Sequence, residues 1–113
     1  DEAEAYRTLP ENWKTYLGSL PSAWDETRLV DGYPGQYVVL ARRKGDRWWV
    51  GAINGSSESR NLVLDLSFVS GGMTVLTDGG GEPESYRVEQ QSSKTSIELA
   101  PYGGVAMYPK ITQ

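Results

Sequence analysis

The chain has 113 residues, which is enough for one domain that buries a core without covalent cross-links. It contains neither cysteine nor histidine, which excludes disulfides, thiol nucleophiles, histidine metal ligands and a histidine general base. The formal net charge of -4 comes from interspersed acidic and basic residues, so nucleic acid is not an expected partner. The longest apolar run, YVVLA at 37–41, is too short to cross a membrane.

The N-terminal region predicts one short helix. The polar residues 1–5, DEAEA, resemble the spacer that yeast secretion vectors leave, although a frayed natural terminus has the same appearance. Thr8-Leu9-Pro10-Glu11 matches a capping box, and Gly18 and Pro21 end the helical pattern. Large apolar residues recur between them at helical spacing and form one face: Trp13, Tyr16, Leu17 and Leu20. Such a face needs a covering partner.

The remainder of the chain predicts strands separated by Gly- and Ser-rich turns. Lys44-Gly45-Asp46 has the pattern of a tight hairpin in which Gly45 adopts a positive φ. Residues 61–68 alternate, with leucines on one face and Asp65 on the other, as in a half-buried strand. Seven short strands and no second helix favour an antiparallel sandwich or barrel: 36–43, 47–53, 61–68, 73–77, 85–90, 95–100 and 104–108.

Two adjacent tryptophans mark the second of these strands. Successive strand residues point to opposite faces, so Trp48 and Trp49 cannot form a two-ring platform together. One should lie in the core, and the other on the outer face or beneath a neighbouring element. Exposed aromatic rings also suit the stacking of sugars, and the candidate carbohydrate-binding residues are Trp48, Trp49, Tyr86, Tyr102 and Tyr108. Packing and contact with another domain is the preferred interpretation.

Acidic residues are the remaining source of chemistry. Glycoside hydrolysis needs two carboxylates across one cleft, but Asp25-Glu26 opens the linker between helix and sheet, where capping or a turn is the expected role. Asp65 and Glu98 alternate with apolar residues and should face solvent. Asp78 and Glu82 flank three glycines and offer oxygen ligands for calcium, although a hairpin turn is the preferred interpretation. No catalytic residue is assigned, and no cofactor beyond this weak calcium candidate.

Residues 21–69 resemble the C-terminal domain of glycoside hydrolase family 97. The segment 99–104 extends the similarity moderately, whereas residues 70–98 depart from it: residues 77–81 replace a longer acidic insertion, and Asn54-Gly55-Ser56, also a glycosylation sequon, replaces an aromatic turn. The motifs that carry the resemblance, each weak alone but fairly specific in their order, are Pro21-x-x-Trp24-Asp25-Glu26-Thr27, Gly35-x-Tyr37, Ala41-Arg42-Arg43-Lys44-Gly45-Asp46, an aromatic-aromatic-x-Gly strand and Leu64-Asp65-Leu66-Ser67-Phe68.

The resemblance implies a non-catalytic role. Enzymes of that family are bacterial, calcium-dependent α-glycosidases whose catalytic residues and calcium ligands lie on a barrel and an N-terminal β-domain, neither of which matches this chain. Their C-terminal domain is a β-sandwich that packs on the barrel and is described as an oligomerisation domain. We therefore expect an all-β fold, an antiparallel β-sandwich of about seven or eight strands of Greek-key type at 21–113. It should be preceded at 1–20 by an N-terminal tail and one short helix, which corresponds to the end of the barrel.

The resemblance also implies partners and a location. We expect contact with the catalytic barrel of a larger α-glycosidase, self-association, and a periplasmic or secreted location. The residues predicted to contact the barrel are Trp13, Tyr16, Leu17 and Trp24. Without a barrel, the helix should fold back onto the sandwich or mediate self-association, because each aromatic ring buries roughly 150–250 Å². The alternatives are a free-standing carbohydrate-binding module and, less favoured, a minimal glycosidase.

Overall fold

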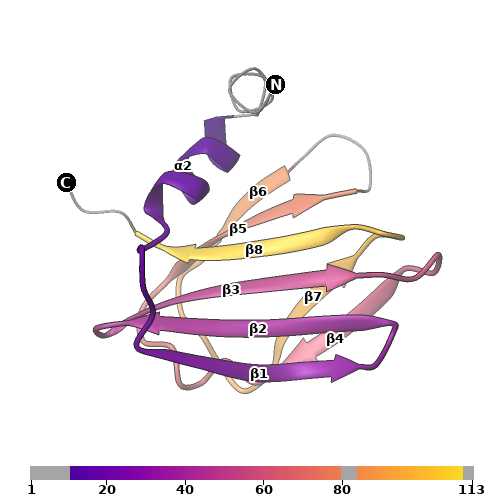
Figure 1. Ribbon diagram of the computed structural model, residues 1–113, viewed down its shortest axis with the longest axis horizontal. Coiled ribbons are helices and arrows are strands. Elements are labelled where there is room, and N and C mark those ends of the chain that lie inside the picture. The colour runs from indigo at the N-terminus through magenta and orange to yellow at the C-terminus, as the bar shows by residue number, and fades with distance from the viewer. Residues whose placement is uncertain (1–10, 80–83, 111–113) are drawn as a thin grey trace.

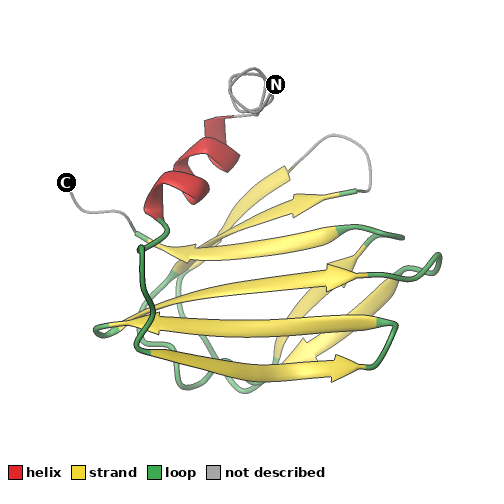
Figure 2. Ribbon diagram, viewed as in Figure 1, coloured by secondary structure: helices red, strands yellow, loops and turns green. Residues whose placement is uncertain are grey.

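The computed structural model describes residues 11–79 and 84–110, and within them it is an all-β fold with one short helix, as predicted (Figure 1). Figure 2 shows that the strands form two layers and that the helix lies outside them. The elements in chain order are α2 (Glu11–Ser19), β1 (Glu26–Tyr33), β2 (Tyr37–Lys44), β3 (Arg47–Asn54), β4 (Arg60–Leu64), β5 (Met73–Asp78), β6 (Glu84–Val88), β7 (Thr95–Leu99) and β8 (Gly104–Pro109). No helix in the described part of the chain has the length and apolarity that crossing a membrane requires.

Two antiparallel sheets of unequal size make up the sandwich. The larger has six strands in the order β1-β2-β3-β8-β5-β6, and the smaller consists of β4 and β7. In Figure 1 the small sheet lies behind the large one. After the β5–β6 hairpin the chain crosses to β7 in the other sheet and returns as β8 beside β5, which is a Greek-key connection with one strand in the second layer.

The core lies between the sheets and is built mainly from alternating residues of the strands. The large sheet contributes small and medium side chains such as Val39, Val50 and Met107, which are almost fully buried. β4 and the residues that follow it contribute the predicted leucine face, in which Leu64 and Leu66 are buried while Asp65 is exposed. Alternation therefore places one face of most strands in the core, as in a sandwich, whereas the edge strand β6 is exposed along most of its length.

Strand β1 is the element that the sequence did not predict, since its residues had been interpreted as a linker. The pairing of β1 with β2 shifts register between Leu29 and Asp31, so a β-bulge interrupts the alternation that would have revealed the strand. β1 is also an edge strand, and four of its eight positions are charged or glycine, as is typical of protected edges. A bulge and a polar edge together concealed it.

Strand β4 is shorter than predicted, because the chain leaves the sheet after Leu64. A carboxylate oxygen of Asp65 accepts hydrogen bonds from the backbone N–H of Ser67 at 3.0 Å and from its hydroxyl at 2.6 Å, which forms an Asx turn. Leu66 remains buried nonetheless, and its N–H donates to the carbonyl of Ser92 at 3.0 Å. The hydrophobic alternation thus continues past the end of the strand.

Helix α2 folds back onto the outer face of the large sheet, which is one of the two arrangements predicted for it. The indole Nε1 of Trp49 donates a hydrogen bond to the hydroxyl of Ser19 at 2.9 Å, and the rings of Tyr16 and Tyr108 lie 5.9 Å apart. The helix begins at Glu11 and ends at Ser19, close to the predicted stop. The predicted capping residue Thr8 lies outside the described residues.

Candidate functional site

The outer face of the large sheet is apolar although much of it is uncovered. Leu29, Leu40, Gly51, Ala106 and Leu76 are neighbours in register across five strands and lie on this face. At the β5–β8 side, α2 covers Leu76 and Ala106, which are buried. At the β1 side, Leu29 keeps 65% of its surface exposed. An apolar face that is half covered and half open is typical of an interaction surface.

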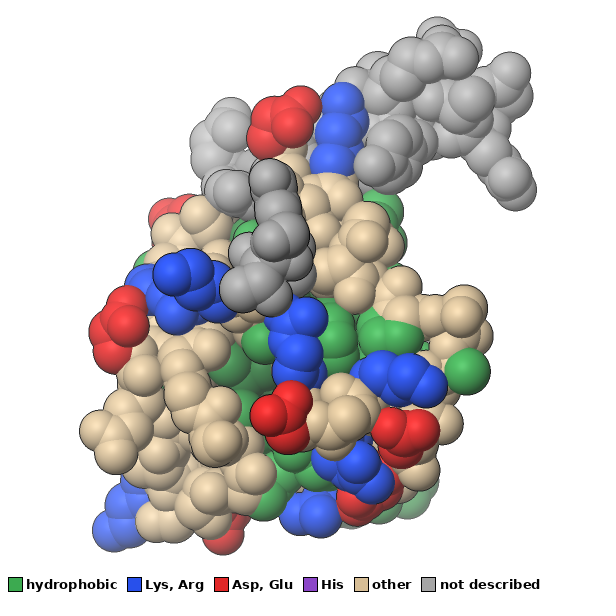
Figure 3. All heavy atoms as spheres, turned by 90° about the vertical axis from the view of Figure 1, so that its left-hand side faces the viewer, with side chains coloured by type: hydrophobic (Ala, Val, Ile, Leu, Met, Phe, Trp, Pro, Cys, Tyr) green, Lys and Arg blue, Asp and Glu red, His purple; other side chains and the backbone are tan. Residues whose placement is uncertain are grey.

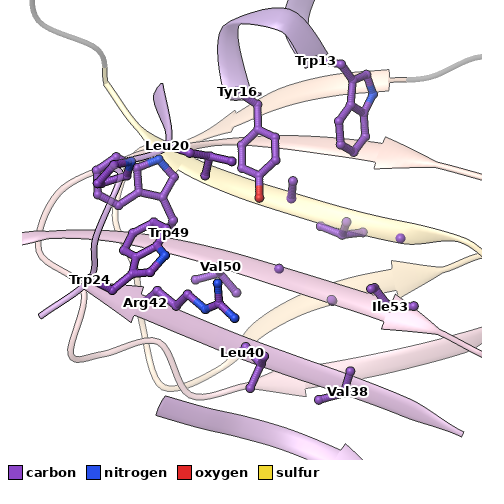
Figure 4. Close-up of a pocket in the computed structure, with 16 residues that line it drawn as sticks. Trp13, Tyr16, Leu20, Trp24, Val38, Leu40, Arg42, Trp49, Val50 and Ile53 are labelled. Atoms are coloured by element: carbon purple, nitrogen blue, oxygen red, sulfur yellow. The ribbon is translucent and has the colours of Figure 1, made fainter. Parts of the chain in front are cut away.

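A hollow of about 430 Å³ lies between α2 and this face. Trp13 and Tyr16 descend from the helix on one side, and Trp24 closes one end (Figure 4). The floor consists of small residues of β3 and β8, including Gly51 and Ala106. Burial raises the pKa of the Tyr16 hydroxyl, as expected for a phenol beneath an aromatic cover, and the positive charge of Arg42 partly opposes this shift.

A second hollow of about 500 Å³ continues the first toward the β1 edge. Val38 and Ile53 line both hollows, and Leu29 and Tyr33 extend the second one. The four side chains are exposed, Ile53 to 63%. We call the two hollows together the outer groove, defined by Trp13, Tyr16, Trp24, Leu29, Tyr33, Val38, Leu40, Arg42, Gly51 and Ile53.

The two tryptophans of β3 lie on opposite faces, as predicted. Trp48 belongs to the core between the sheets and stacks edge-on against Phe68, with ring centroids 4.7 Å apart. Trp49 lies on the outer face beneath α2, with the ring of Trp24 at 5.3 Å. Both are buried, with exposed fractions of 6% and 5%. The second ring therefore lies beneath a neighbouring element, which was one of the two expected positions.

The predicted carbohydrate-binding residues do not gather at one place. Trp48, Trp49 and Tyr108 are buried, so their ring faces contact protein. Tyr86 is exposed on the edge strand β6, and burial raises the pKa of its hydroxyl. Tyr102 is exposed in the β7–β8 turn at a φ of 53°. Carbohydrate binding stays a prediction, and in this structure it would depend on these last two rings, which lie on different elements.

Unlike the predicted carbohydrate-binding residues, most of the residues predicted to contact another domain lie together, around the outer groove. Trp13, Tyr16 and Trp24 are half buried and pack against the outer cluster of Trp49, Leu76, Ala106 and Tyr108. Leu17 is not part of this cluster, and 40% of its surface is exposed. Three of the four residues thus line the groove itself, and Leu17 adds apolar surface on the helix.

Asp25 and Glu26 form ion pairs at the end of the sheet where the β2–β3 hairpin lies. Asp25 accepts a hydrogen bond from the N–H of Gly45 at 2.8 Å, and Glu26 contacts Arg28 at 3.0 Å and Arg43 at 3.2 Å. Figure 3 views this end and shows acidic and basic side chains around a hydrophobic centre. The role of Asp25 is therefore to fix the hairpin, where Gly45 has the predicted positive φ, here 63°.

These contacts predict acid sensitivity. The Gly45 N–H bond lowers the pKa of Asp25, and the Arg28 bond lowers the pKa of Glu26, from ordinary values of 3.8 and 4.5. A lowered pKa in the folded state stabilises the fold above the ordinary pKa, and this contribution is lost as the pH falls through the folded-state pKa. Between about pH 6 and about pH 3, Tm should fall more for the wild type than for an Asp25→Asn, Glu26→Gln double variant. If the Tm of the two proteins, followed by circular dichroism, falls equally over this pH range, these ion pairs and hydrogen bonds are not the source of the acid sensitivity.

Metal binding finds no support beyond the original prediction. Among the described residues there is no group of three or more acidic side chains that could hold a metal ion. Asp78 ends β5 and is exposed, whereas Glu82 lies outside the described residues. Calcium binding at this turn stays a prediction.

The sequence did not reveal the outer groove. Leu29 lies on the strand that was missed, and Gly51 resembled an ordinary strand glycine. Arg42 and Ile53 carried the alternation that places them on the outer face, but that pattern does not say which residues lie beside them. The order β1-β2-β3-β8 brings them together, and a sequence does not display strand order.

Comparisons with known proteins agree with this architecture. Over 117 residues the chain is 35% identical to a retaining α-galactosidase of Bacteroides thetaiotaomicron, covering 95% of the chain and 17% of that protein. A probable retaining α-galactosidase of Streptomyces bingchenggensis is 34% identical over 93 residues, covering 80% of the chain and 15% of that protein. The chain therefore spans about a sixth of the length of these curated relatives.

Solved structures show the same sandwich. A crystal structure of a β-arabinopyranosidase superposes with a TM-score of 0.77 at 38% identity, covering 89% of this chain and 17% of that one. A glycoside hydrolase family 97 enzyme from Pseudoalteromonas sp. strain K8, in complex with acarbose, superposes with a TM-score of 0.69 at 23% identity, covering 92% and 20%. At 23% identity, this second similarity supports the fold and no more than the fold.

The family match covers most of the chain. Residues 23–110 match the family described as glycosyl-hydrolase 97 C-terminal, oligomerisation, which includes all eight described strands. The match is to this non-catalytic domain, in agreement with the resemblance seen in the sequence motifs and with the expected absence of an active site of its own. The chain belongs to the C-terminal oligomerisation domains of glycoside hydrolase family 97.

Proposed function

We propose that this domain packs on the catalytic barrel of a larger α-glycosidase through the outer groove and thereby stabilises the enzyme and its oligomer. The observation that carries the proposal is the apolar outer face, on which Leu29 and Ile53 remain 65% and 63% exposed beside a groove lined by aromatic side chains. A soluble domain rarely leaves such a continuous apolar surface in water unless a partner covers it. Family membership supports a barrel as that partner, and the periplasmic or secreted location remains part of the proposal.

The position of α2 also supports the outer groove as the docking surface. In chain order α2 precedes the sandwich and lies against one half of the outer face, and the chain that follows it runs across the end of the large sheet to β1 (Figure 1). Aromatic side chains of this helix and of Trp24 provide rigid, apolar contact area, which is the kind that dominates interface energies. A neighbouring domain upstream of α2 is therefore well placed to cover the open half.

The test compares two exposed apolar residues on opposite faces. Ile53→Asp changes the outer groove, and Val63→Asp changes the far side of β4, where Val63 is 64% exposed. In the isolated domain the two variants should differ in unfolding free energy by no more than about 1 kcal/mol, because both side chains are on solvated strand faces. In the full-length enzyme, Ile53→Asp should lower Tm and release the domain to limited proteolysis, whereas Val63→Asp should not.

Calorimetry of both proteins measures the difference. If the two variants shift the Tm of the full-length enzyme equally, the outer groove is not the docking surface. Sedimentation velocity on the same samples reports the oligomer: if only Val63→Asp dissociates it, the oligomer contact lies on the small sheet rather than beside the groove.

A further inference from the structure

Gly51 lies at the middle of a central strand, where glycine is costly. β3 is the third of six strands and pairs with β2 and β8 on either side of Gly51. Glycine in a strand interior loses side-chain packing and conformational entropy, and it often marks a place where another group approaches closely. The φ of Gly51 lies outside the left-handed region, and a Cβ atom built on it would meet nothing within 4 Å. Neither the backbone nor the domain's own packing therefore requires glycine here.

Arg42 lies beside this open floor and has no acidic partner in the part of the chain that the structure describes. Its neighbour Arg43 contacts both Asp25 and Glu26, but among the described residues Arg42 makes no ion pair. Its guanidinium lies over the ring of Trp24, 5.9 Å from the centroid, and extends into the groove (Figure 4). A cation that lines an apolar groove and lacks a carboxylate is complementary to a partner that provides one.

We propose that the outer groove receives a bulky apolar side chain of the catalytic domain over Gly51, and that a carboxylate next to this side chain pairs with Arg42. The proposal rests on the function proposed above and specifies what the partner presents. The floor of Gly51 and Ala106 gives the hollow its depth, while Tyr16, Trp24 and Leu40 form walls around an inserted side chain. Once covered, the ion pair is shielded from solvent, which strengthens it and fixes the register of the two domains.

The glycine provides a steric test that does not damage the domain itself. Gly51→Val fills the floor of the groove. Because a Cβ atom at this position meets nothing within 4 Å and valine favours strands, the isolated domain should keep or raise its Tm. In the full-length enzyme the same variant should release the domain to limited proteolysis and separate its unfolding transition from that of the catalytic domain. Gly51→Ala, which adds one carbon atom, should have a smaller effect in the same direction.

The arginine provides an electrostatic test with a matched control. Arg42→Glu and Lys94→Glu change the net charge equally, and Lys94 is exposed in the β6–β7 connection, away from the groove. In the full-length enzyme Arg42→Glu should increase the rate of proteolytic release at least about 10-fold relative to Lys94→Glu, because it places the new carboxylate of residue 42 against the partner's carboxylate in the covered interface. Arg42→Lys keeps the charge and should restore most of the resistance.

The outcomes separate the two proposals. If Ile53→Asp releases the domain but Gly51→Val and Arg42→Glu do not, the groove contact is overturned while docking through this face stands. If none of the three releases it, the proposed function fails as well. A dimer of the isolated domain that Gly51→Val abolishes would make a second copy the occupant. A tryptophan fluorescence change with maltose or melibiose that the same variant abolishes would make the occupant a sugar. Either result would overturn the inference.

Discussion

Replacing Trp48 with alanine is expected to lower the free energy of unfolding by about 3–5 kcal/mol, the usual loss for a large aromatic residue in a core. Trp48 is 6% exposed and lies between the sheets, with Phe68 at 4.7 Å and the guanidinium of Arg28 at 5.1 Å from its ring centroid. The small sheet has only two strands, so few neighbouring side chains can move to fill the cavity. Urea denaturation followed by far-UV circular dichroism measures the change.

Trp49→Ala is the matched comparison, because it removes the same side chain from the opposite face. Trp49 is equally buried, but its cover is α2 and Trp24 rather than a second sheet. A nine-residue helix can shift to close part of the gap, so the loss should lie at or below about 3 kcal/mol. Hydrogen exchange should show faster exchange in α2 for Trp49→Ala, and throughout the sandwich for Trp48→Ala. The reverse pattern would contradict the assignment of the two faces.

The paired tryptophans also show how far the sequence can be interpreted. The two-residue period of a strand predicts that Trp48 and Trp49 point to opposite faces, and the aromatic spacing of residues 13–20 predicts a helix that needs a cover. These two predictions are consistent with α2 on the sandwich, but they leave self-association of the helix face as an alternative. They do not identify Trp49 as the residue that α2 covers, because that contact spans 30 positions in the chain, from Ser19 to Trp49.

Arg42 and Arg43 show the limit of this approach. Alternation assigns them to opposite faces, but the two residues are chemically identical, and nothing local indicates that one is paired and the other is not. The difference arises because β1 brings Glu26 opposite Arg43. Since the bulge at Leu29 and Asp31 conceals β1 in the sequence, the groove beside Arg42 could not be predicted either. Local patterns define the elements, whereas the site depends on strand order.

Replacing Asn54 with alanine is expected to lower the free energy of unfolding by about 2–4 kcal/mol, because it removes the four hydrogen bonds of a buried amide and leaves the N–H of Ser56 without its acceptor. The side chain is 1% exposed at the end of β3. Its amide nitrogen donates to the carbonyls of Glu58 at 2.7 Å and Ala100 at 3.0 Å, and its oxygen accepts from the N–H and hydroxyl of Ser56 at 3.0 and 2.9 Å. One amide thus joins two loops to the central strand.

The isosteric variant distinguishes hydrogen bonding from packing. Asn54→Asp keeps the shape of the side chain but replaces the NH2 group, and with it both donors, with one oxygen that faces the carbonyls of Glu58 and Ala100. Near pH 7 it should therefore cost at least as much as alanine. If it is tolerated better than alanine, packing rather than hydrogen bonding holds the loops.

The same geometry affects the sequon, since both amide hydrogens are used and the nitrogen is buried in the folded domain. If the domain folds before it meets a glycosylating enzyme, it should therefore carry no glycan at Asn54. The intact mass of the domain after secretion from a yeast host measures this.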